Sequence, residues 1–170
     1  MASTLQTLVS RALRAIDLVS PPATAHAHCD IPCGIYDPHL AQIAALTVVR
    51  MNQLIEAARG DAPKTESSLS RYIEVKEEHS ELVKREVRIL WGDYFKPEHL
   101  EKHKDLHTVV WNILKAAGKT RQENNLAAAQ DLLAQVQKLA EIFWDTKGVK
   151  AKRQPSNQGA AGGELVYPAG

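Results

Sequence analysis

Four amphipathic segments constrain the fold of this chain more than any other feature of its 170 residues. In each segment apolar side chains recur at helical spacing, and polar or charged side chains occupy the opposite side. The segments are residues 37–60, 68–90, 105–117 and 122–147. Because short connections separate them, consecutive helices must turn back on one another. The pattern predicts an all-α protein, an antiparallel four-helix bundle.

The composition is that of a soluble globular chain and excludes two classes of partner. Hydrophobic residues make up 44% of the chain, and with only 3 Trp, 4 Tyr and 2 Phe the core must consist mainly of Leu, Ile, Val and Ala. A net charge of +1 gives no basic excess for nucleic acid. No apolar run reaches the roughly 18 residues needed to cross a bilayer. We therefore expect neither a nucleic acid nor a membrane as partner.

Two terminal regions fall outside the helical pattern. Residues 1–27 contain Arg11 and Arg14 but little acid, and Pro21-Pro22 would end any helix there. We expect a leader that is removed on maturation of a cytoplasmic protein, with import into an organelle as the alternative. Residues 149–170 are rich in Gly, Pro, Ala, Gln and Lys and lack periodic apolar positions, which predicts a disordered tail.

Both cysteines lie in one short segment, HCDIPCGIYDP, at residues 28–38. Pro32 and Gly34 flank Cys33 and exclude a regular helix, so the backbone must bend into a hook. The spacing from Cys29 to Cys33 is not Cys-x-x-Cys, and no second cysteine pair exists to complete a zinc or iron–sulfur site. A local disulfide or two inert thiols remain alternatives to a metal site.

His28, directly before Cys29, makes a metal site possible. Cleavage after Ala27 would bring a free amine, an imidazole, the Cys29 backbone nitrogen and two thiolates within reach of one ion. Nitrogen and sulfur donors in one plane select nickel(II) or copper(II) over zinc. The sequence thus predicts a nickel or copper site that forms only after the chain has been cut.

The segment HCDIPCGIYDP resembles the nickel-binding hook of nickel-containing superoxide dismutases. Two further stretches agree with the same family, LWGDYFKPEHLEKHKDLH at residues 90–107 and IFWDTK at residues 142–147. The resemblance implies one nickel ion per subunit, held by His28, Cys29 and Cys33. It also implies an enzyme that converts superoxide to oxygen and hydrogen peroxide by Ni(II)/Ni(III) cycling, a homohexamer, and a maturation peptidase that cuts before His28.

The resemblance assigns supporting roles to other matching positions. Tyr36 matches the family's tyrosine beside the open face of the metal, where a phenol can hold an anion or water by hydrogen bonding. Asp30 and Pro32 shape the hook. Tyr94 and Lys96 match residues near the access path, where a lysine attracts a small anion.

The chain departs from the family at the residues that hold the axial imidazole. Some members have a glutamate and an arginine there, and the aligned positions in this chain are Ala44 and His79. We expect His79 to orient His28 directly, or a neighbouring glutamate to supply the missing carboxylate. The candidate glutamates are Glu77, Glu78 and Glu81.

A second metal site can be imagined at His99, His103 and His107, which form a column if all three are helical. Pro97 and Asp105 indicate that a helix begins only partway along this column, and the surrounding charges are typical of a solvated face. We therefore interpret these histidines as surface residues.

Two further alternatives concern the aromatic residues and the activity. We expect Trp91, Phe95 and Trp144 to serve core or interface packing rather than chemistry. A non-enzymatic nickel or copper carrier is the alternative to a dismutase, because the same hook can capture a metal without turnover. Tyr36, Tyr94 and Lys96 favour the enzyme, because a carrier has no need of an anion gate.

Overall fold

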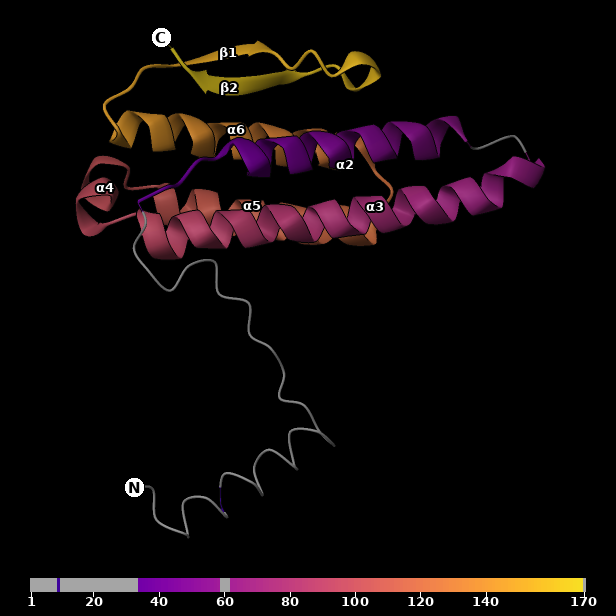
Figure 1. Cartoon of the computed structure of the whole chain (residues 1–170), viewed down its shortest axis with the longest axis horizontal. Helices are drawn as coiled ribbons and strands as arrows, with labels where there is room; N and C mark the ends of the chain where they lie inside the picture. The colour runs from indigo at the N-terminus through magenta and orange to yellow at the C-terminus, as the bar shows by residue number, and fades with distance from the viewer. Residues whose placement is uncertain (1–8, 10–33, 59–61, 170) are drawn as a thin grey trace. The chain divides into compact units, whose positions relative to one another are not determined.

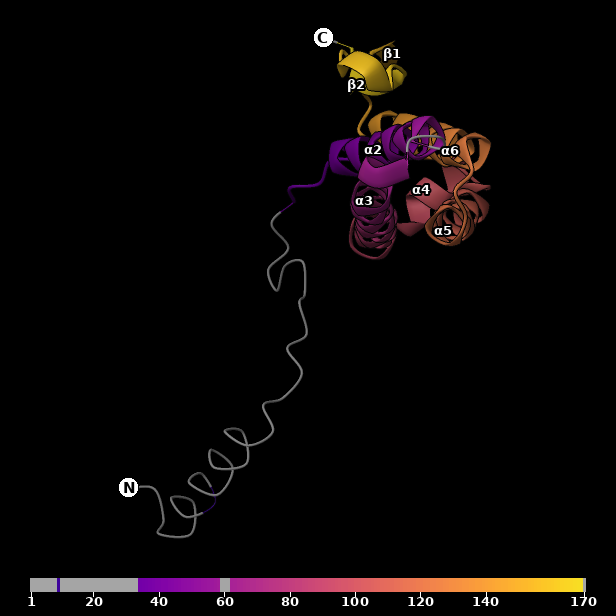
Figure 2. The ribbon, with the colours of Figure 1, turned by 90° about the vertical axis from the view of Figure 1, so that its right-hand side faces the viewer.

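The computed structural model describes Val9 and residues 34–58 and 62–169. The chain divides into two units, Met1–Cys33 and Gly34–Gly170, and the account below concerns the second. Its main elements are four long helices, α2 (His39–Ala57), α3 (Ala62–Ile89), α5 (Leu106–Gln122) and α6 (Leu126–Thr146). Figure 2 shows α2 and α6 in one layer and α3 and α5 in the other. The predicted four-helix bundle is confirmed.

Local hydrogen bonds explain where the helices begin. The carboxylate of Asp37 accepts a hydrogen bond from the N–H of His39, the first residue of α2, at 2.7 Å, although Pro38 is the N-cap. The side chain of Asn125 accepts one from the Ala128 N–H at 3.0 Å and caps α6. That cap places the start of α6 at Leu126, later than the sequence pattern indicated.

The predicted end of the third helix at Gly118 is wrong, because α5 continues to Gln122. Glycine in a helix interior is destabilising by about 1 kcal/mol relative to alanine, and α5 tolerates this cost. A Cβ at Gly118 would stand 3.5 Å from the Lys84 Nζ of α3, which is an ordinary contact distance. The glycine therefore neither ends the helix nor is required by the packing of α3 against α5.

The segment WGDYFKP lies between two of the predicted helices, but it is itself helical over most of its length. It forms η1 (Leu90–Tyr94), a single π-helical turn that continues α3, and Pro97 then begins the short α4 (Pro97–Lys102). The Phe95 N–H donates to the Leu90 carbonyl at 3.0 Å, the five-residue bond of a π turn. Proline suits the first turn of α4 because its missing N–H has no partner there.

The predicted disordered tail is also wrong, because most of it forms a β-hairpin. The antiparallel strands β1 (Ala151–Pro155) and β2 (Glu164–Pro168) are joined through the 3₁₀ turn η2 (Gly159–Ala161). The hairpin lies along α6 and α2 on one side of the bundle (Figure 1). Leu165 and Val166 become buried there, which supplies the apolar contact that the composition did not indicate.

A buried glutamine anchors this hairpin. The Gln42 Nε2 on α2 donates to the Val166 carbonyl at 3.0 Å, and the Val166 N–H donates to the Gln42 Oε1 at 2.7 Å. The side chain thus replaces a neighbouring strand at the free edge of β2. Nearby, Gln137 on α6 donates to the Glu164 carbonyl at 2.6 Å. Together these bonds satisfy backbone groups that would otherwise be buried without partners.

The core consists mainly of Leu, Ile, Val and Ala, as the composition indicated, with Phe143 fully buried among them. Among the residues that the structure describes, one charged side chain is also buried. The Lys76 Nζ on α3 donates to the Glu123 carbonyl at 2.9 Å, the Asn124 Oδ1 at 2.8 Å and the Arg121 carbonyl at 3.3 Å. Burial lowers the pKa of Lys76. The lysine ties α3 to the connection between α5 and α6.

Candidate functional site

The predicted metal ligands lie outside the described residues. These are His28, Cys29 and Cys33, together with Asp30 and Pro32 of the hook. The structure describes the chain from Gly34 onward, and this glycine has a φ of 71°, in the left-handed region that favours glycine. The hook geometry remains a prediction, whereas the residues that follow the hook can be placed.

Tyr36 and Tyr94, distant in sequence, lie side by side in the structure. Tyr36 precedes α2, Tyr94 ends the π turn after α3, and their ring centroids are 5.5 Å apart at an interplanar angle of 49°. Both side chains are half-buried. The fold therefore brings the WGDYFKP segment into contact with Tyr36, which follows Cys33 by three positions in the sequence.

Tyr94 is held from several directions. Its ring lies 4.6 Å from that of Phe143 on α6, and its hydroxyl lies 2.9 Å from the Thr146 Oγ1. The Thr146 hydroxyl donates its own proton to the Phe143 carbonyl at 2.7 Å, so the phenol of Tyr94 must be the donor to Thr146. The phenol oxygen keeps its capacity to accept a hydrogen bond.

Two lysines add positive charge beside this tyrosine. The Lys147 Nζ lies 5.5 Å from the centroid of the Tyr94 ring, within cation–π range. Lys96 lies two residues beyond Tyr94 with an exposed side chain, and its backbone N–H donates to the His99 Nδ1 at 3.2 Å. Lys147 thus places a positive charge at the Tyr94 ring, although the whole chain is close to neutral.

The three histidines considered as a second metal site do not form a column, because α4 ends at Lys102. His99 stacks on Tyr94 at 5.5 Å, and the His103 Nε2 lies 2.7 Å from the Asp145 Oδ2. His107 accepts a hydrogen bond from the Trp91 indole at 3.0 Å. Each ring has a separate partner. Within the described residues, no group of three or more His, Cys, Asp or Glu side chains is arranged to hold a metal.

Asp145 fastens α4 to the end of α6. Its carboxylate lies 2.7 Å from the Lys102 Nζ and 2.7 Å from the His103 Nε2. The hydrogen bond from Lys102, followed by that from His103, lowers the pKa of Asp145 below its ordinary value. The ionised carboxylate of Asp145 therefore links the end of α4 to the last turn of α6.

His79 has a defined orientation on α3. Its Nδ1 lies 2.8 Å from the Val75 carbonyl, which can only accept, so the Nδ1 carries the proton. The Nε2 of the neutral ring is then an acceptor. Ala44, at the other position where this chain departs from the family, is fully buried in the core and offers no polar group. An orienting role for His79 toward His28 remains a prediction.

Phe95 and Trp144 pack against the core, as expected. Trp91 is 44% exposed and has His107 as an aromatic neighbour, so it lies outside the core, and its expected interface role stays a prediction. The sequence did not reveal Thr146 or His99 as neighbours of Tyr94. Both residues lie in the two stretches that agree with the family, and the sequence contains no other indication of their role. Contacts between side chains of distant segments do not affect the spacing of residues along the chain.

Comparisons with known proteins agree with this architecture. A sequence model described as nickel-containing superoxide dismutase matches residues 23–147. The chain is 39% identical over 130 residues to a superoxide dismutase [Ni] of Streptomyces coelicolor and 37% identical over 130 residues to one of Streptomyces seoulensis. Each alignment covers 76% of this chain and 95% of the relative.

Solved structures show the same relationship. A native nickel superoxide dismutase matches with a TM-score of 0.64 and 38% identity, covering 71% of this chain and 99% of the other. A structure with nickel ligation corresponding to the oxidized state matches with a TM-score of 0.65 and 36% identity over the same shares. The family match ends before β1, so the C-terminal hairpin lies beyond it.

A four-helix bundle preceded in the sequence by two cysteines, with a match to nickel-containing enzymes along most of its length, defines a helical metalloenzyme. The chain belongs to the nickel-containing superoxide dismutase family. It is accordingly an oxidoreductase with nickel as its cofactor and superoxide as its substrate. Within the described residues, none of the helices is both long and apolar enough to cross a membrane.

Proposed function

We propose that the reaction takes place at a nickel ion bound by residues 28–33 after the leader has been removed, with Tyr36, Tyr94 and Lys96 serving the approach of superoxide. The observation that carries this proposal is the contact between Tyr36 and Tyr94 at 5.5 Å. It joins the segment that leaves the hook to the loop that carries Lys96. The activity and the nickel are properties of the family, and the proposal concerns the residues and their roles.

The donor set in the hook fits nickel. His28 offers an amine and an imidazole, Cys29 a backbone nitrogen and a thiolate, and Cys33 a second thiolate. Such nitrogen and sulfur donors would suit nickel(II), and thiolates with an anionic amide would lower its potential. Nickel bound there supplies the one-electron chemistry. In the net reaction, two superoxide anions and two protons yield one oxygen and one hydrogen peroxide.

The residues around Tyr94 handle the anion. Lys96 and Lys147 attract superoxide over short distances, which matters because the net charge of +1 gives no strong field around the whole chain. The Tyr94 phenol donates to Thr146, so its ring is fixed while its oxygen can accept a hydrogen bond from water. Tyr36, in contact with that ring, gates the space beside the hook.

Further parts of the proposal concern His28 and its surroundings. A maturation peptidase cuts before His28, and residues 1–27 are the leader that it removes. His79 holds the His28 imidazole through its Nε2, whose lone pair the bond to Val75 leaves available. The mature protein is a homo-oligomer, a hexamer by resemblance, and works in the cytoplasm.

The leader provides the test of this proposal. A chain that begins at His28 and a chain that retains residues 1–27 are loaded with nickel, and bound nickel and superoxide consumption are measured for each. We expect about one nickel per mature chain with rapid turnover, and little of either for the uncut chain, because an internal peptide nitrogen cannot act as a neutral amine donor. Equal activity of the two chains would refute the proposed ligand set.

If the protein were a non-enzymatic metal carrier, the cut and uncut chains would give a different result. A carrier would bind nickel after cleavage but consume superoxide no faster than the free ion does. Membership in a dismutase family favours the enzyme.

A further inference from the structure

Residues of α3 and α5 line a groove with a volume of about 540 Å³. Four basic side chains and one tryptophan are among them, and none of the lining residues is acidic. Lys84 belongs to α3, whereas Trp111, Lys115 and Lys119 belong to α5. None of these residues belongs to the candidate site around Tyr94. The groove is therefore a cationic surface that the proposed nickel chemistry does not use.

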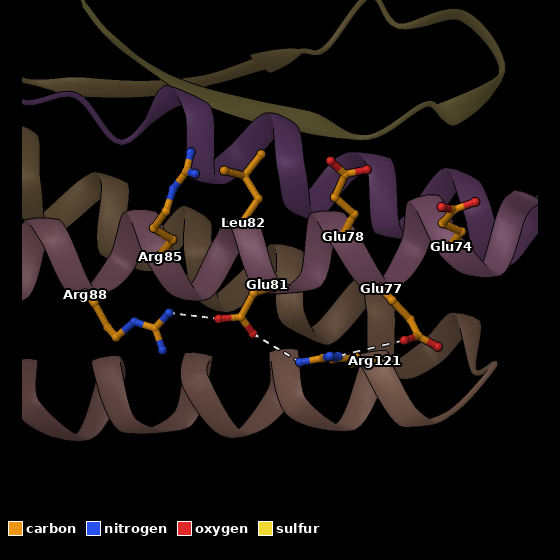
Figure 3. Close-up of a pocket in the computed structure, with 8 residues that line it drawn as sticks. All are labelled: Glu74, Glu77, Glu78, Glu81, Leu82, Arg85, Arg88 and Arg121. Atoms are coloured by element: carbon orange, nitrogen blue, oxygen red, sulfur yellow. Dashed lines mark hydrogen bonds and ion pairs between the residues drawn. The ribbon is translucent and has the colours of Figure 1, made fainter. Parts of the chain in front are cut away.

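A second groove along α3, drawn in Figure 3, has a different balance of charge. Four glutamates and three arginines line it. Arg88 lies 2.9 Å from Glu81, and Arg121 lies 3.4 Å from the same carboxylate. Arg88 borders both grooves, and Figure 3 shows it paired with Glu81. The charge of Arg88 is thus balanced within the chain, which leaves three lysines in the cationic groove.

These three lysines have no acidic partner. Within the described part of the chain, Lys84, Lys115 and Lys119 make no ion pair. Lys115 and Lys119 are four residues apart on α5, so they lie on the same side of the helix and repel each other. The Lys84 Nζ reaches the same helix, 3.5 Å from the point where a Cβ of Gly118 would stand. An anion in the groove would relieve this repulsion.

Trp111 gives the groove an aromatic surface. This residue is 61% exposed, although tryptophan is largely buried in most proteins. The Lys115 Nζ lies 4.4 Å from the centroid of the Trp111 ring, within cation–π range. The contact keeps the indole beside the lysines while much of the residue stays accessible. An exposed indole is a stacking surface for planar rings such as nucleobases.

We propose that the groove binds a nucleotide, with its phosphates at Lys84, Lys115 and Lys119 and its base stacked on Trp111. Lysine ammonium groups bind phosphate oxygens as point charges. The volume of the groove is within the range of small-molecule sites. This binding site is separate from the metal hook and does not rest on the proposed function.

The geometry favours a mononucleotide over other polyanions. Lys115 and Lys119 are separated by about 6 Å along α5, because an α-helix rises about 1.5 Å per residue. This separation suits a diphosphate or triphosphate group. An inorganic polyphosphate would make no use of Trp111. A nucleic-acid strand requires a longer basic surface, and a chain with a net charge of +1 offers no such excess.

Binding of ATP and of inorganic triphosphate to the nickel-loaded protein tests the proposal. Isothermal titration calorimetry at low salt measures both affinities for the wild type, for the double variant Lys84→Gln/Lys119→Gln and for Trp111→Ala. The double variant should bind each ligand about tenfold or more weakly, because it loses two charge-assisted contacts. Trp111→Ala should bind triphosphate as the wild type does and ATP about tenfold more weakly, because only ATP carries a base.

Lys104→Gln is the matched control, because Lys104 is exposed and does not line the groove. It should bind both ligands as the wild type does. Circular dichroism and nickel content should be the same in every variant, since none of the substitutions touches the core or the hook. High salt should weaken triphosphate binding by the wild type, because it screens exposed charges.

Several outcomes would overturn the proposal. Failure of the wild type to bind ATP would show that the groove is no nucleotide site. ATP affinity that neither groove variant changes would place the ligand elsewhere, for example at the nickel ion. Equal losses of ATP and triphosphate in Trp111→Ala would exclude stacking. A single-stranded oligonucleotide that binds more tightly than ATP would assign the groove to nucleic acid instead.

Discussion

The phenol of Tyr94 donates its proton to the hydroxyl of Thr146 across 2.9 Å, because Thr146 commits its own proton to the Phe143 carbonyl. This bond joins the π turn after α3 to the last turn of α6. It fixes the ring that Tyr36 contacts, and it sets which groups of the phenol remain available to substrate or water. The site thus depends on a hydrogen bond between two elements that sequence spacing does not connect.

Replacing Tyr94 by Phe should separate the structural role of this hydroxyl from its functional role. The loss of one half-buried hydrogen bond should lower the free energy of unfolding by about 1 kcal/mol. Turnover of superoxide should fall roughly tenfold if the phenol oxygen also serves the reaction, since one lost hydrogen bond in a transition state has that effect. Nickel content per chain should stay constant.

Thr146→Val is the matched control, because it removes the same bond but keeps the phenol. Urea unfolding and turnover are compared for both variants. A similar loss of stability with nearly unchanged turnover is expected for Thr146→Val. Equal losses of turnover would mean that Tyr94 acts only through its bond to Thr146.

Replacing either hook cysteine by serine should abolish nickel binding and turnover. A hydroxyl is a far weaker donor than a thiolate to a soft or borderline metal. Helix content should change little, because the buried core of the bundle is built from residues beyond the hook. Metal analysis and far-ultraviolet circular dichroism provide the measurements for Cys29→Ser and Cys33→Ser.

His107→Asn is the control for these variants, since His107 pairs with Trp91 rather than with the other histidines of the surface. It should bind nickel as the wild type does. Loss of nickel from His107→Asn together with retention by Cys33→Ser would point to the histidines instead of the hook.

Gln42 should be among the most sensitive positions outside the site. Replacing it by Ala leaves the N–H and carbonyl of Val166 buried without partners, and each such group costs about 1–3 kcal/mol. We expect a loss of roughly 2–4 kcal/mol in urea unfolding. Gln53→Ala is the comparison, because Gln53 is half-buried and its two side-chain bonds are long. It donates to the Ala161 carbonyl at 3.3 Å and accepts from the Arg50 side chain at 3.2 Å.

Gln53→Ala should destabilise the chain by less than about 1 kcal/mol. Hydrogen exchange at β2 should accelerate strongly in Gln42→Ala and only slightly in the comparison variant. Equal effects would show that the hairpin is held by Leu165 and Val166 alone.

Acid should loosen α4 through Asp145. In the folded chain the pKa of this carboxyl lies below its ordinary value of 3.8, mainly because Lys102 donates a hydrogen bond to it. A carboxyl whose pKa is lower in the folded state stabilises it above the ordinary pKa, and the contribution is lost as pH falls through the lowered value. The unfolding free energy of the wild type should therefore fall more steeply in acid than that of Asp145→Asn.

Asp93→Asn serves as the control, because Asp93 is exposed and makes no ion pair among the described residues. Its unfolding free energy should follow the wild-type dependence on pH. Identical acid slopes for the wild type and Asp145→Asn would contradict the assigned role of the Lys102–Asp145 contact.

The sequence was most informative where the signal is local. Periodic apolar residues indicated the four helices, because each helix must turn one side toward a shared core. The segment HCDIPCGIYDP and the two stretches that agree with it indicated the family, since metal donors lie close together in the chain. The prediction failed at Gly118, where a glycine indicated a helix end but α5 continues to Gln122.

Only the tertiary structure showed which distant groups meet. Tyr36 contacts Tyr94, Thr146 holds that ring, and the three histidines take separate partners because α4 ends at Lys102. The C-terminal residues looked disordered because two short strands bury few apolar side chains of their own. They fold because α2 and α6 supply Gln42, Gln137 and an apolar surface, and contacts between segments far apart in the chain leave no periodic trace in the sequence.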